Sequence, residues 1–124
     1  MESIGLVIVS HSKHIAEGVV ELISKVAKDV PITYVGGTEG GGIGTIFDQV
    51  DRVVSENPAD TLLAFFDLGS AKMNLKMVTD FSDKSIIINR VPIVEGAYNA
   101  AALLQAGAEL SVIQTQLAEL EINK

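Results

Sequence analysis

The sequence predicts an α/β fold: an open, doubly wound, mostly parallel sheet of four strands in the order 2-1-3-4, with helices on both faces. Four short apolar runs alternate along the chain with segments whose apolar residues recur at helical spacing. The first and third runs are apolar without interruption, which is typical of parallel strands that are buried on both faces. The 124 residues are enough for one domain, predicted at 1–124.

The first strand is predicted at residues 4–9, which read IGLVIV. A helix is expected to follow, because the next apolar residues recur three and four positions apart; they are Ile15, Val19, Leu22, Ile23 and Val26. The segment Ser10-His11-Ser12 joins these two elements. The second strand is predicted at 32–35, after Pro31.

A glycine-rich loop, GGTEGGGIGT, occupies residues 36–45 and leads into a helix that bears Phe47, Val50 and Val54. The turn ENPAD ends this helix, and the third strand is predicted at 61–66. The next helix bears Met73, Met77 and Phe81, with Ser70 as its predicted N-cap. We expect the two methionines to pack along that helix, or else Leu68 and Met73 to form a rim for a partner.

The fourth strand is predicted at 85–89 and ends near Pro92. Two helices complete the chain: an alanine-rich one at about 94–106 and a second with an apolar stripe of Leu110, Ile113, Leu117 and Leu120. This stripe is expected to pack on the core, with a subunit interface as the alternative.

Charge and composition exclude several classes of protein. Sixteen acidic residues oppose nine basic ones, for a net charge of −7, whereas proteins that bind phosphate backbones need a basic surface. No nucleic-acid partner is therefore expected. The chain has no cysteine, and its start lacks a secretory signal pattern, so we expect a cytoplasmic protein. Its apolar runs are far shorter than the roughly 20 residues of a membrane span.

Two polar side chains follow strands that should be neighbours, His11 after the first strand and Asp67 after the third. In the order 2-1-3-4 the winding reverses between these strands, and ligands bind at the carboxyl edge beside that switch point. We therefore expect the imidazole and the carboxylate in one site. Asp67 would accept a hydrogen bond from one ring nitrogen, fix the tautomer, and leave the other nitrogen free as base, nucleophile or metal ligand.

The glycine loop is expected at the same edge, with six glycines in ten residues. Such a loop can turn amide N–H groups inward, and the helix start that follows adds partial positive charge, so the two favour an anion such as phosphate. The loop matches neither the phosphate-loop pattern nor the dinucleotide pattern. Hydroxyl groups that can join the pocket are those of Ser10, Ser12, Thr38 and Ser70.

Each feature also has a purely structural interpretation. His11 can be a cap or surface residue, Asp67 can simply end a strand, and the glycines can form a surface turn. The coincidence of all three at one predicted edge favours a functional site. His14, the other histidine, is expected to face solvent on the first turn of its helix.

Four segments carry a family resemblance: VIVSHSKHIAEG, GGTEGGGIGT, FFDLGSAKMN and VPIVEGAYNAA. Together they resemble the mannose-family EIIA domain of the bacterial phosphoenolpyruvate-dependent phosphotransferase system. The resemblance spans nearly the whole chain, and its first and third segments are the most specific. The run Asp-Leu-Gly-Ser-Ala favours the branch that serves phosphoenolpyruvate-dependent dihydroxyacetone kinases over the sugar-transport branch, which stays the alternative.

The resemblance implies a histidine phosphocarrier. In that family a histidine after the first strand accepts a phosphoryl group from the phosphocarrier HPr, and an aspartate after the third strand orients its ring. The matching residues are His11 and Asp67. Donors to the phosphoryl group, rather than a metal, are then expected from the surrounding loops; the candidates are Ser12, Gly37, Thr38, Gly69 and Ser70.

The resemblance also implies partners. The phosphoryl group passes to ADP, held with Mg²⁺ by a DhaL subunit, and DhaL with ATP then phosphorylates dihydroxyacetone bound to a DhaK subunit. No cofactor is expected on this chain itself. It carries no HPr-like domain after residue 124, so a separate HPr is expected, and members of the family are commonly homodimers.

Three interpretations from other classes compete with this one. A response-regulator-like receiver shares the topology but needs an acidic pair after the first strand, where this chain has Ser10-His11-Ser12. A noncatalytic module that binds a small anion needs the glycine loop but no nucleophile. A His–Asp metal hydrolase needs more imidazole and carboxylate ligands than this region supplies.

Overall fold

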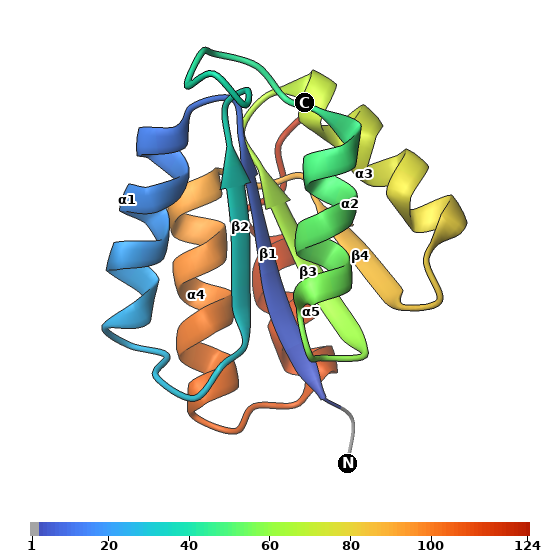
Figure 1. The fold of residues 1–124 in the computed structure, drawn as a ribbon. Helices are drawn as coiled ribbons and strands as arrows, with labels where there is room; N and C mark the ends of the chain where they lie inside the picture. The colour runs from blue at the N-terminus through green and yellow to red at the C-terminus, as the bar shows by residue number, and fades with distance from the viewer. Residues whose placement is uncertain (1–2) are drawn as a thin grey trace.

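A computed structural model describes residues 3–124 and leaves the first two residues of the predicted domain outside the description (Figure 1). Strands and helices alternate from β1 to β4 and are followed by two further helices. Their bounds are β1 Ile4–Ser10, α1 Lys13–Ser24, β2 Ile32–Gly36, α2 Phe47–Glu56, β3 Thr61–Phe66, α3 Gly69–Phe81, β4 Ser85–Asn89, α4 Ile93–Gln105 and α5 Leu110–Ala118.

The four strands form one sheet in the order β2-β1-β3-β4, and every neighbouring pair is parallel. The predicted fold class and strand order are therefore confirmed. In this register Val9 of β1 lies between Val35 of β2 and Phe66 of β3. The carboxyl ends of the three strands consequently lie at one edge of the sheet, and the segments that follow β1 and β3 leave it side by side.

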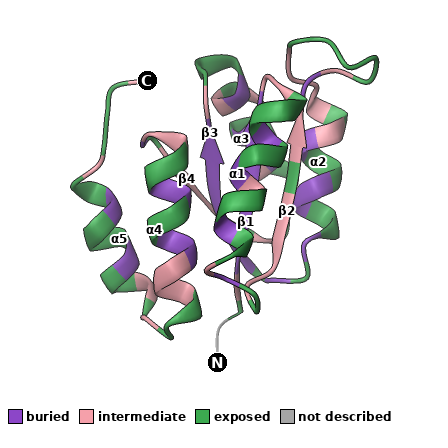
Figure 2. Ribbon diagram, turned by 90° about the vertical axis from the view of Figure 1, so that its left-hand side faces the viewer, coloured by how far each residue is buried: buried purple, intermediate pink, exposed green. Residues whose placement is uncertain are grey.

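Helices cover both faces of the sheet (Figure 1). Alternate residues of β1 point to opposite faces, as expected of a strand, so Leu6 and Ile8 join one core and Val7 and Val9 join the other. The first core is completed by α1, α4 and α5, and the second by α2 and α3. Figure 2 shows the resulting burial of β3, whose residues are all buried. Burial on both faces explains the uninterrupted apolar runs.

The stripe on α5 belongs to the chain's own core. Ile113 and Leu117 are buried there, and Leu110 and Leu120 are half-buried against the same cluster. The alternative, a subunit interface made by this stripe, is therefore wrong. In contrast, α3 exposes Met73, Met77 and Phe81, the last of them 79% exposed, so these side chains are not packing residues of the core.

The helix α1 differs from its predicted pattern at its end and on its buried face. It ends at Ser24, so Val26, which the pattern placed on the helix, lies beyond it. The apolar face that packs on the sheet consists of Ala16, Val19 and Ile23, whereas Ile15 and Leu22 are exposed. A small residue, Ala16, occupies the position where α1 passes close to Gly36, at the end of β2. The pattern based on large side chains missed this contact. Among residues 3–124, no helix combines the length and apolar character needed to cross a membrane.

Candidate functional site

The segments after β1 and β3 bring His11 and Asp67 together at the carboxyl edge of the sheet. The Nδ1 atom of His11 lies 2.8 Å from Oδ1 of Asp67. Both side chains are largely withdrawn from solvent, with 12% of the imidazole and 14% of the carboxylate side chain exposed. The two residues are 56 positions apart in sequence. Their contact follows from the pairing of β1 with β3, which places both loops at the switch point of the sheet.

Each oxygen of the Asp67 carboxylate accepts two hydrogen bonds. Oδ1 accepts from the His11 ring and, at 2.7 Å, from the backbone N–H of Leu68. Oδ2 accepts from the Ser10 hydroxyl at 2.6 Å and from the backbone N–H of His11 at 3.0 Å. The carboxylate is thereby fixed in orientation by donors from the ends of both strands.

These bonds also decide the charge of Asp67. Burial alone would raise the pKa of the carboxyl group, because it disfavours the ionised form. Hydrogen bonds from the Ser10 side chain, from His11 and from the Leu68 amide outweigh burial and hold the pKa of Asp67 below its usual value of 3.8. Asp67 is therefore an anion near neutral pH.

An ionised carboxylate carries no proton, so Nδ1 of His11 must donate the hydrogen bond that joins them. The neutral ring then has its lone pair on Nε2, which is the nitrogen turned away from Asp67. Nε2 accepts a hydrogen bond from the hydroxyl of Ser70. The arrangement presents a single oriented nucleophilic nitrogen next to a hydroxyl group.

Ser70 reaches the ring from the first turn of α3. The prediction that it is the N-cap is wrong: α3 begins at Gly69, and its N-cap is Leu68, whose side chain makes no capping bond. Ser70 instead uses its hydroxyl on His11. The first amide groups of a helix have no acceptor within it, so those of Gly69 and Ser70 add donors at this end of α3.

Ser12 and Ser10 hold the segment around His11 in place. The Ser12 hydroxyl caps α1 by accepting from the Ile15 amide at 3.3 Å. The Ser10 hydroxyl, besides donating to Asp67, accepts from the Ser12 amide at 3.0 Å. The sequence suggested Ser10 only as a donor to the pocket and missed its contact with Asp67; its place between the strand and His11 is the signal that could have suggested it.

The glycine loop lies next to the His11 segment and is bonded to it. The amide of Gly37 donates to the Ser10 carbonyl at 3.2 Å, and the amide of Gly44 donates to the His11 carbonyl at 2.9 Å. Thr38 closes the loop on itself, since its amide donates to the Gly42 carbonyl and its hydroxyl accepts from the Gly42 amide. In this arrangement the loop shapes the site, and a contact of Gly37 or Thr38 with a phosphoryl group stays a prediction.

Two further side chains complete the description of the site and its surroundings. His14 has 95% of its side chain exposed, as the sequence predicted, and lies on the solvent side of α1. Lys124 reaches the end of β3, where its ammonium group donates to the Phe66 carbonyl at 2.6 Å. No sequence pattern suggested this contact. Within residues 3–124, no group of three or more His, Cys, Asp or Glu side chains is arranged to hold a metal ion.

Comparison with known proteins agrees with this architecture. The model of the EIIA-man family, described as the fructose IIA component of the phosphotransferase system, matches residues 5–114. The chain belongs to the EIIA-man family. The match includes β1, β3 and both residues of the His11–Asp67 pair, so the site lies within the part of the chain that the family model covers.

Curated relatives within the family share much of this sequence. The chain is 53% identical to the phosphotransferase subunit DhaM of the PTS-dependent dihydroxyacetone kinase of Lactococcus lactis, with 97% of this chain and 98% of that protein covered. It is 49% identical to the phosphoryl donor subunit DhaM of dihydroxyacetone kinase 1 of Listeria innocua, with 95% of each covered.

Two solved structures have a fold similar to that of this chain. The crystal structure of EF1359, a protein of unknown function, has a TM-score of 0.84 and 26% identity over 98% of this chain and 97% of that one. A sigma-54 interaction domain protein from Enterococcus faecalis has a TM-score of 0.73 over 95% and 90% of the two chains. At 11% identity, the second likeness concerns the fold alone.

Proposed function

We propose that this EIIA-man protein is a histidine phosphocarrier of a dihydroxyacetone kinase. In this proposal, Nε2 of His11 accepts a phosphoryl group from phospho-HPr and passes it to ADP bound to a DhaL subunit. The observation that carries the proposal is the pairing of Nδ1 with an ionised Asp67, which directs the lone pair of Nε2 outward. The names of the relatives in Lactococcus and Listeria support dihydroxyacetone kinase as the system.

In the first step Nε2 gives up its hydrogen bond from the Ser70 hydroxyl, and its lone pair forms a bond to phosphorus. The bond from phosphorus to the donor breaks, and its electron pair stays with HPr. The imidazole ring becomes cationic while Nδ1 keeps its proton. The Asp67 carboxylate, 2.8 Å from Nδ1, then stabilises the charge that develops on the ring. No general base is needed, because the neutral ring has no proton on the attacking nitrogen.

The phosphoryl oxygens require donors once the group is attached. The Ser70 hydroxyl already reaches Nε2, and the first amides of α3 lie beside it. We assign these groups, with Gly69, as the primary phosphoryl donors, and Ser12, Thr38 and Gly37 as the second set from the facing loops. The Ser12 and Thr38 hydroxyls can donate while keeping the bonds that they accept, whereas the Gly37 amide would first have to leave the Ser10 carbonyl. In the return step an oxygen of the ADP β-phosphate attacks phosphorus, and Nε2 leaves as the neutral ring.

The partners follow from this cycle. HPr supplies the phosphoryl group, DhaL holds the ADP and Mg²⁺, and DhaK holds dihydroxyacetone, so this chain needs no cofactor of its own. The reaction takes place in the cytoplasm, and the chain acts as a homodimer. The family and the names of the relatives support the kinase system, and the individual partners, the location and the dimer are what the family resemblance implies.

Sugar transport is the competing candidate, because the family description names a fructose component. Identities of 53% and 49% to dihydroxyacetone kinase subunits over nearly the full chain favour the kinase. A passive anion-binding module is a weaker candidate, since binding alone gives no reason for an aspartate that fixes the tautomer of a histidine.

A reconstituted assay tests the proposal. Phosphoenolpyruvate, enzyme I, HPr, DhaL with ADP and DhaK are mixed with dihydroxyacetone, and formation of its phosphate is measured with and without this protein. We expect the product to depend on the protein, to disappear with His11→Ala and to persist with His14→Ala, the matched control on the solvent side of α1. Product formation by His11→Ala at the wild-type rate would exclude the proposed carrier role.

A further inference from the structure

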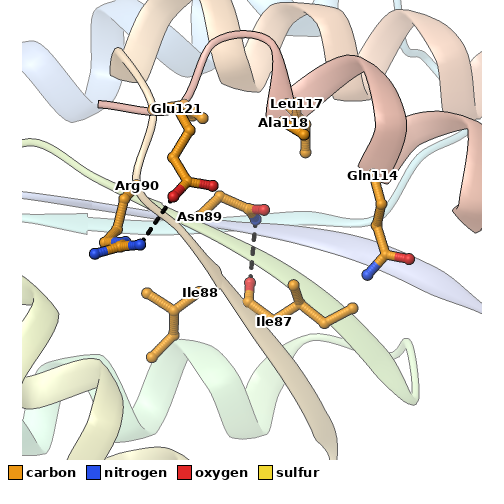
Figure 3. A pocket seen from close by; sticks show the side chains of 9 residues that line it. Ile87, Ile88, Asn89, Arg90, Gln114, Leu117, Ala118 and Glu121 are labelled. Atoms are coloured by element: carbon orange, nitrogen blue, oxygen red, sulfur yellow. Dashed lines mark hydrogen bonds and ion pairs between the residues drawn. The ribbon is translucent and has the colours of Figure 1, made fainter. Parts of the chain in front are cut away.

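The last residues of the chain return to the candidate site. The helix α5 ends at Ala118, and we call the six residues that follow it, 119–124, the strap. The strap runs along the carboxyl edge of the sheet. Figure 1 shows the chain ending at that edge, near α3. The strap is anchored beside β4. The Ile122 amide donates to the Arg90 carbonyl at 2.8 Å, and the Arg90 guanidinium pairs with Glu121 at 2.8 Å. Figure 3 shows this ion pair at the rim of a cavity between β4 and α5.

The far end of the strap is held against β3 and α3. The Lys124 ammonium donates to the carbonyl of Phe66 at 2.6 Å and to the carbonyl of Asp67 at 3.4 Å, and it lies 4.4 Å from the centre of the Phe66 ring. The Lys72 ammonium, from α3, donates to the backbone oxygen of Lys124 at 2.8 Å. The strap therefore links the end of β3 to the first turns of α3.

These contacts lie on both sides of the turn that carries the Asp67 carboxylate and the Ser70 hydroxyl. Between Phe66 and Lys72 lie Asp67, which orients the His11 ring, and Ser70, which contacts its other nitrogen. The intervening residues, Leu68 and Gly69, are exposed and so receive little support from the core. Lys124 holds the two peptide planes that flank the Cα atom of Asp67, and a rotation of either plane would change the direction of the Asp67 side chain.

We propose that Lys124 is a positioning residue for phosphoryl transfer, which holds the β3–α3 turn so that Asp67 and Ser70 meet opposite nitrogens of His11. This inference rests on the proposed function, since transfer through His11 is the reaction that the turn would serve. Lys124 acts through the two carbonyl groups and is not placed in contact with the phosphoryl group.

The environment of Lys124 differs from that of an ordinary surface lysine. Burial lowers the pKa of its ammonium group, and the negative charge of Asp67 opposes that effect. A solvated lysine gains little from a surface contact, because water competes for it. The Lys124 ammonium loses part of its hydration and instead contacts two carbonyl groups and the face of the Phe66 ring. Because this position is partly shielded from water, these contacts are stronger than the same contacts would be on an open surface.

Kinetics separate a positioning role from general stabilisation. Single-turnover transfer from phospho-HPr is measured for wild type, Lys124→Met, Lys124→Arg and Lys28→Met. Lys28 is an exposed residue of the segment before β2, at the opposite edge of the sheet, so its substitution matches the change in charge without touching the turn. We expect Lys124→Met to lower the maximal rate about tenfold or more, with an unchanged dependence on HPr concentration. Lys124→Arg should recover most of the rate, and Lys28→Met should transfer like wild type.

A spectroscopic measurement needs no phosphoryl transfer. The ¹⁵N resonances of the His11 ring in the neutral form report which nitrogen carries the proton. We expect wild type, Lys124→Arg and Lys28→Met to show a proton on Nδ1, and Lys124→Met to show a mixture of tautomers. Circular dichroism and thermal unfolding monitor folding of each variant.

The outcomes distinguish this inference from the proposed function. If wild type accepts phosphoryl and Lys124→Met transfers equally fast with an unaltered ring spectrum, the positioning role is overturned and the carrier role stands. A slow Lys124→Met that Lys124→Arg fails to rescue, with the Nδ1 proton still in place, also overturns it. If wild type accepts no phosphoryl group, the proposed function fails, and the ring spectra alone decide whether Lys124 orients the Asp67–His11 pair.

Discussion

At the scale of single residues, the site depends on a carboxylate whose four hydrogen bonds come from the ends of two strands. Ser10 and the His11 amide bind one oxygen of Asp67, and the His11 ring and the Leu68 amide bind the other. Because every donor favours the ionised form, the carboxylate is both fixed and charged. It can therefore hold the proton of His11 on Nδ1 through the whole transfer cycle.

Replacement of Asp67 by asparagine should slow phosphoryl transfer. The amide can turn its NH₂ group to the ring and so favour the tautomer with the proton on Nε2, the nitrogen that must attack. We expect a loss between about tenfold and about 10⁴-fold in the single-turnover rate from phospho-HPr. Circular dichroism controls for folding. Equal rates in two equally folded proteins would remove Asp67 from the mechanism.

The effect of Asp67→Asn on the free energy of unfolding should depend on pH, because the pKa of Asp67 is lowered in the folded protein. Because the folded-state pKa lies below the usual 3.8, the ionised carboxylate stabilises the folded protein above that pH, and this stabilisation is lost as pH falls through the folded-state pKa. Asp67→Asn should thus cost about 1–3 kcal/mol in free energy of unfolding at pH 7 and clearly less near pH 3. Urea unfolding at both values measures it, and a cost that is independent of pH would contradict the assigned charge.

At the scale of elements, the sequence identified the strands and most helices because burial on both faces leaves a simple pattern. The third strand was predicted at 61–66, and these are the bounds of β3. The pairing of His11 with Asp67 was also predictable, since the strand order alone brings their loops together. The start of α3 was missed because a serine near a helix start resembles an N-cap, whereas the Ser70 hydroxyl has a partner in another loop.

Side-chain contacts between residues far apart in the sequence could not be predicted from the sequence pattern. Lys124 meets Phe66 across 58 positions, and neither residue belongs to a periodic pattern that would relate the two. The use of the glycine-loop amides was also invisible in the sequence, because glycine content shows that a loop can bind an anion but not where its donors point. In the structure, Gly37 and Gly44 donate to the segment around His11.

One glycine at the end of β2 is required by its contact with that segment. A Cβ atom at Gly36 would lie 2.3 Å from the Ser12 carbonyl oxygen, next to His11. Gly36→Ala should lower the free energy of unfolding by about 1–3 kcal/mol and slow transfer, because the Ser12 backbone must move. Gly40→Ala is the matched control in the same loop, since a Cβ there meets nothing within 4 Å. Chemical unfolding measures both variants, and equal stability would show that the loop tolerates the side chain.

At the scale of the whole molecule, three exposed apolar side chains of α3 form a row beside an edge of the sheet. Met73, Met77 and Phe81 recur every fourth residue on the outer side of α3, and α3 packs beside the edge strand β4. The α5 stripe, in contrast, is used inside the chain. An unpaired strand edge beside an apolar helix face is a surface that a second copy can cover symmetrically.

We therefore expect self-association through this face. Light scattering at micromolar concentration should give twice the 13.1 kDa mass of one chain, and Phe81→Asp should shift the mass toward the monomer by placing a charge in the interface. The matched control is Leu22→Asp, which places the same charge at an exposed apolar side chain of α1, the helix that packs on β2 at the other edge of the sheet. A mass of one chain that is independent of dilution in wild type would rule out the dimer, and a dimer unaffected by Phe81→Asp would place its interface elsewhere.

The carrier role of His11 depends on which residue becomes phosphorylated. The protein is incubated with phosphoenolpyruvate, enzyme I and HPr, and its intact mass is measured before and after mild acid and mild base. We expect wild type and His14→Ala to gain one phosphoryl group that acid removes and base leaves in place, as for phosphohistidine, and His11→Ala to gain none. A phosphoryl group that persists in His11→Ala, or a wild-type protein that gains none, would contradict the central claim that His11 is the carrier.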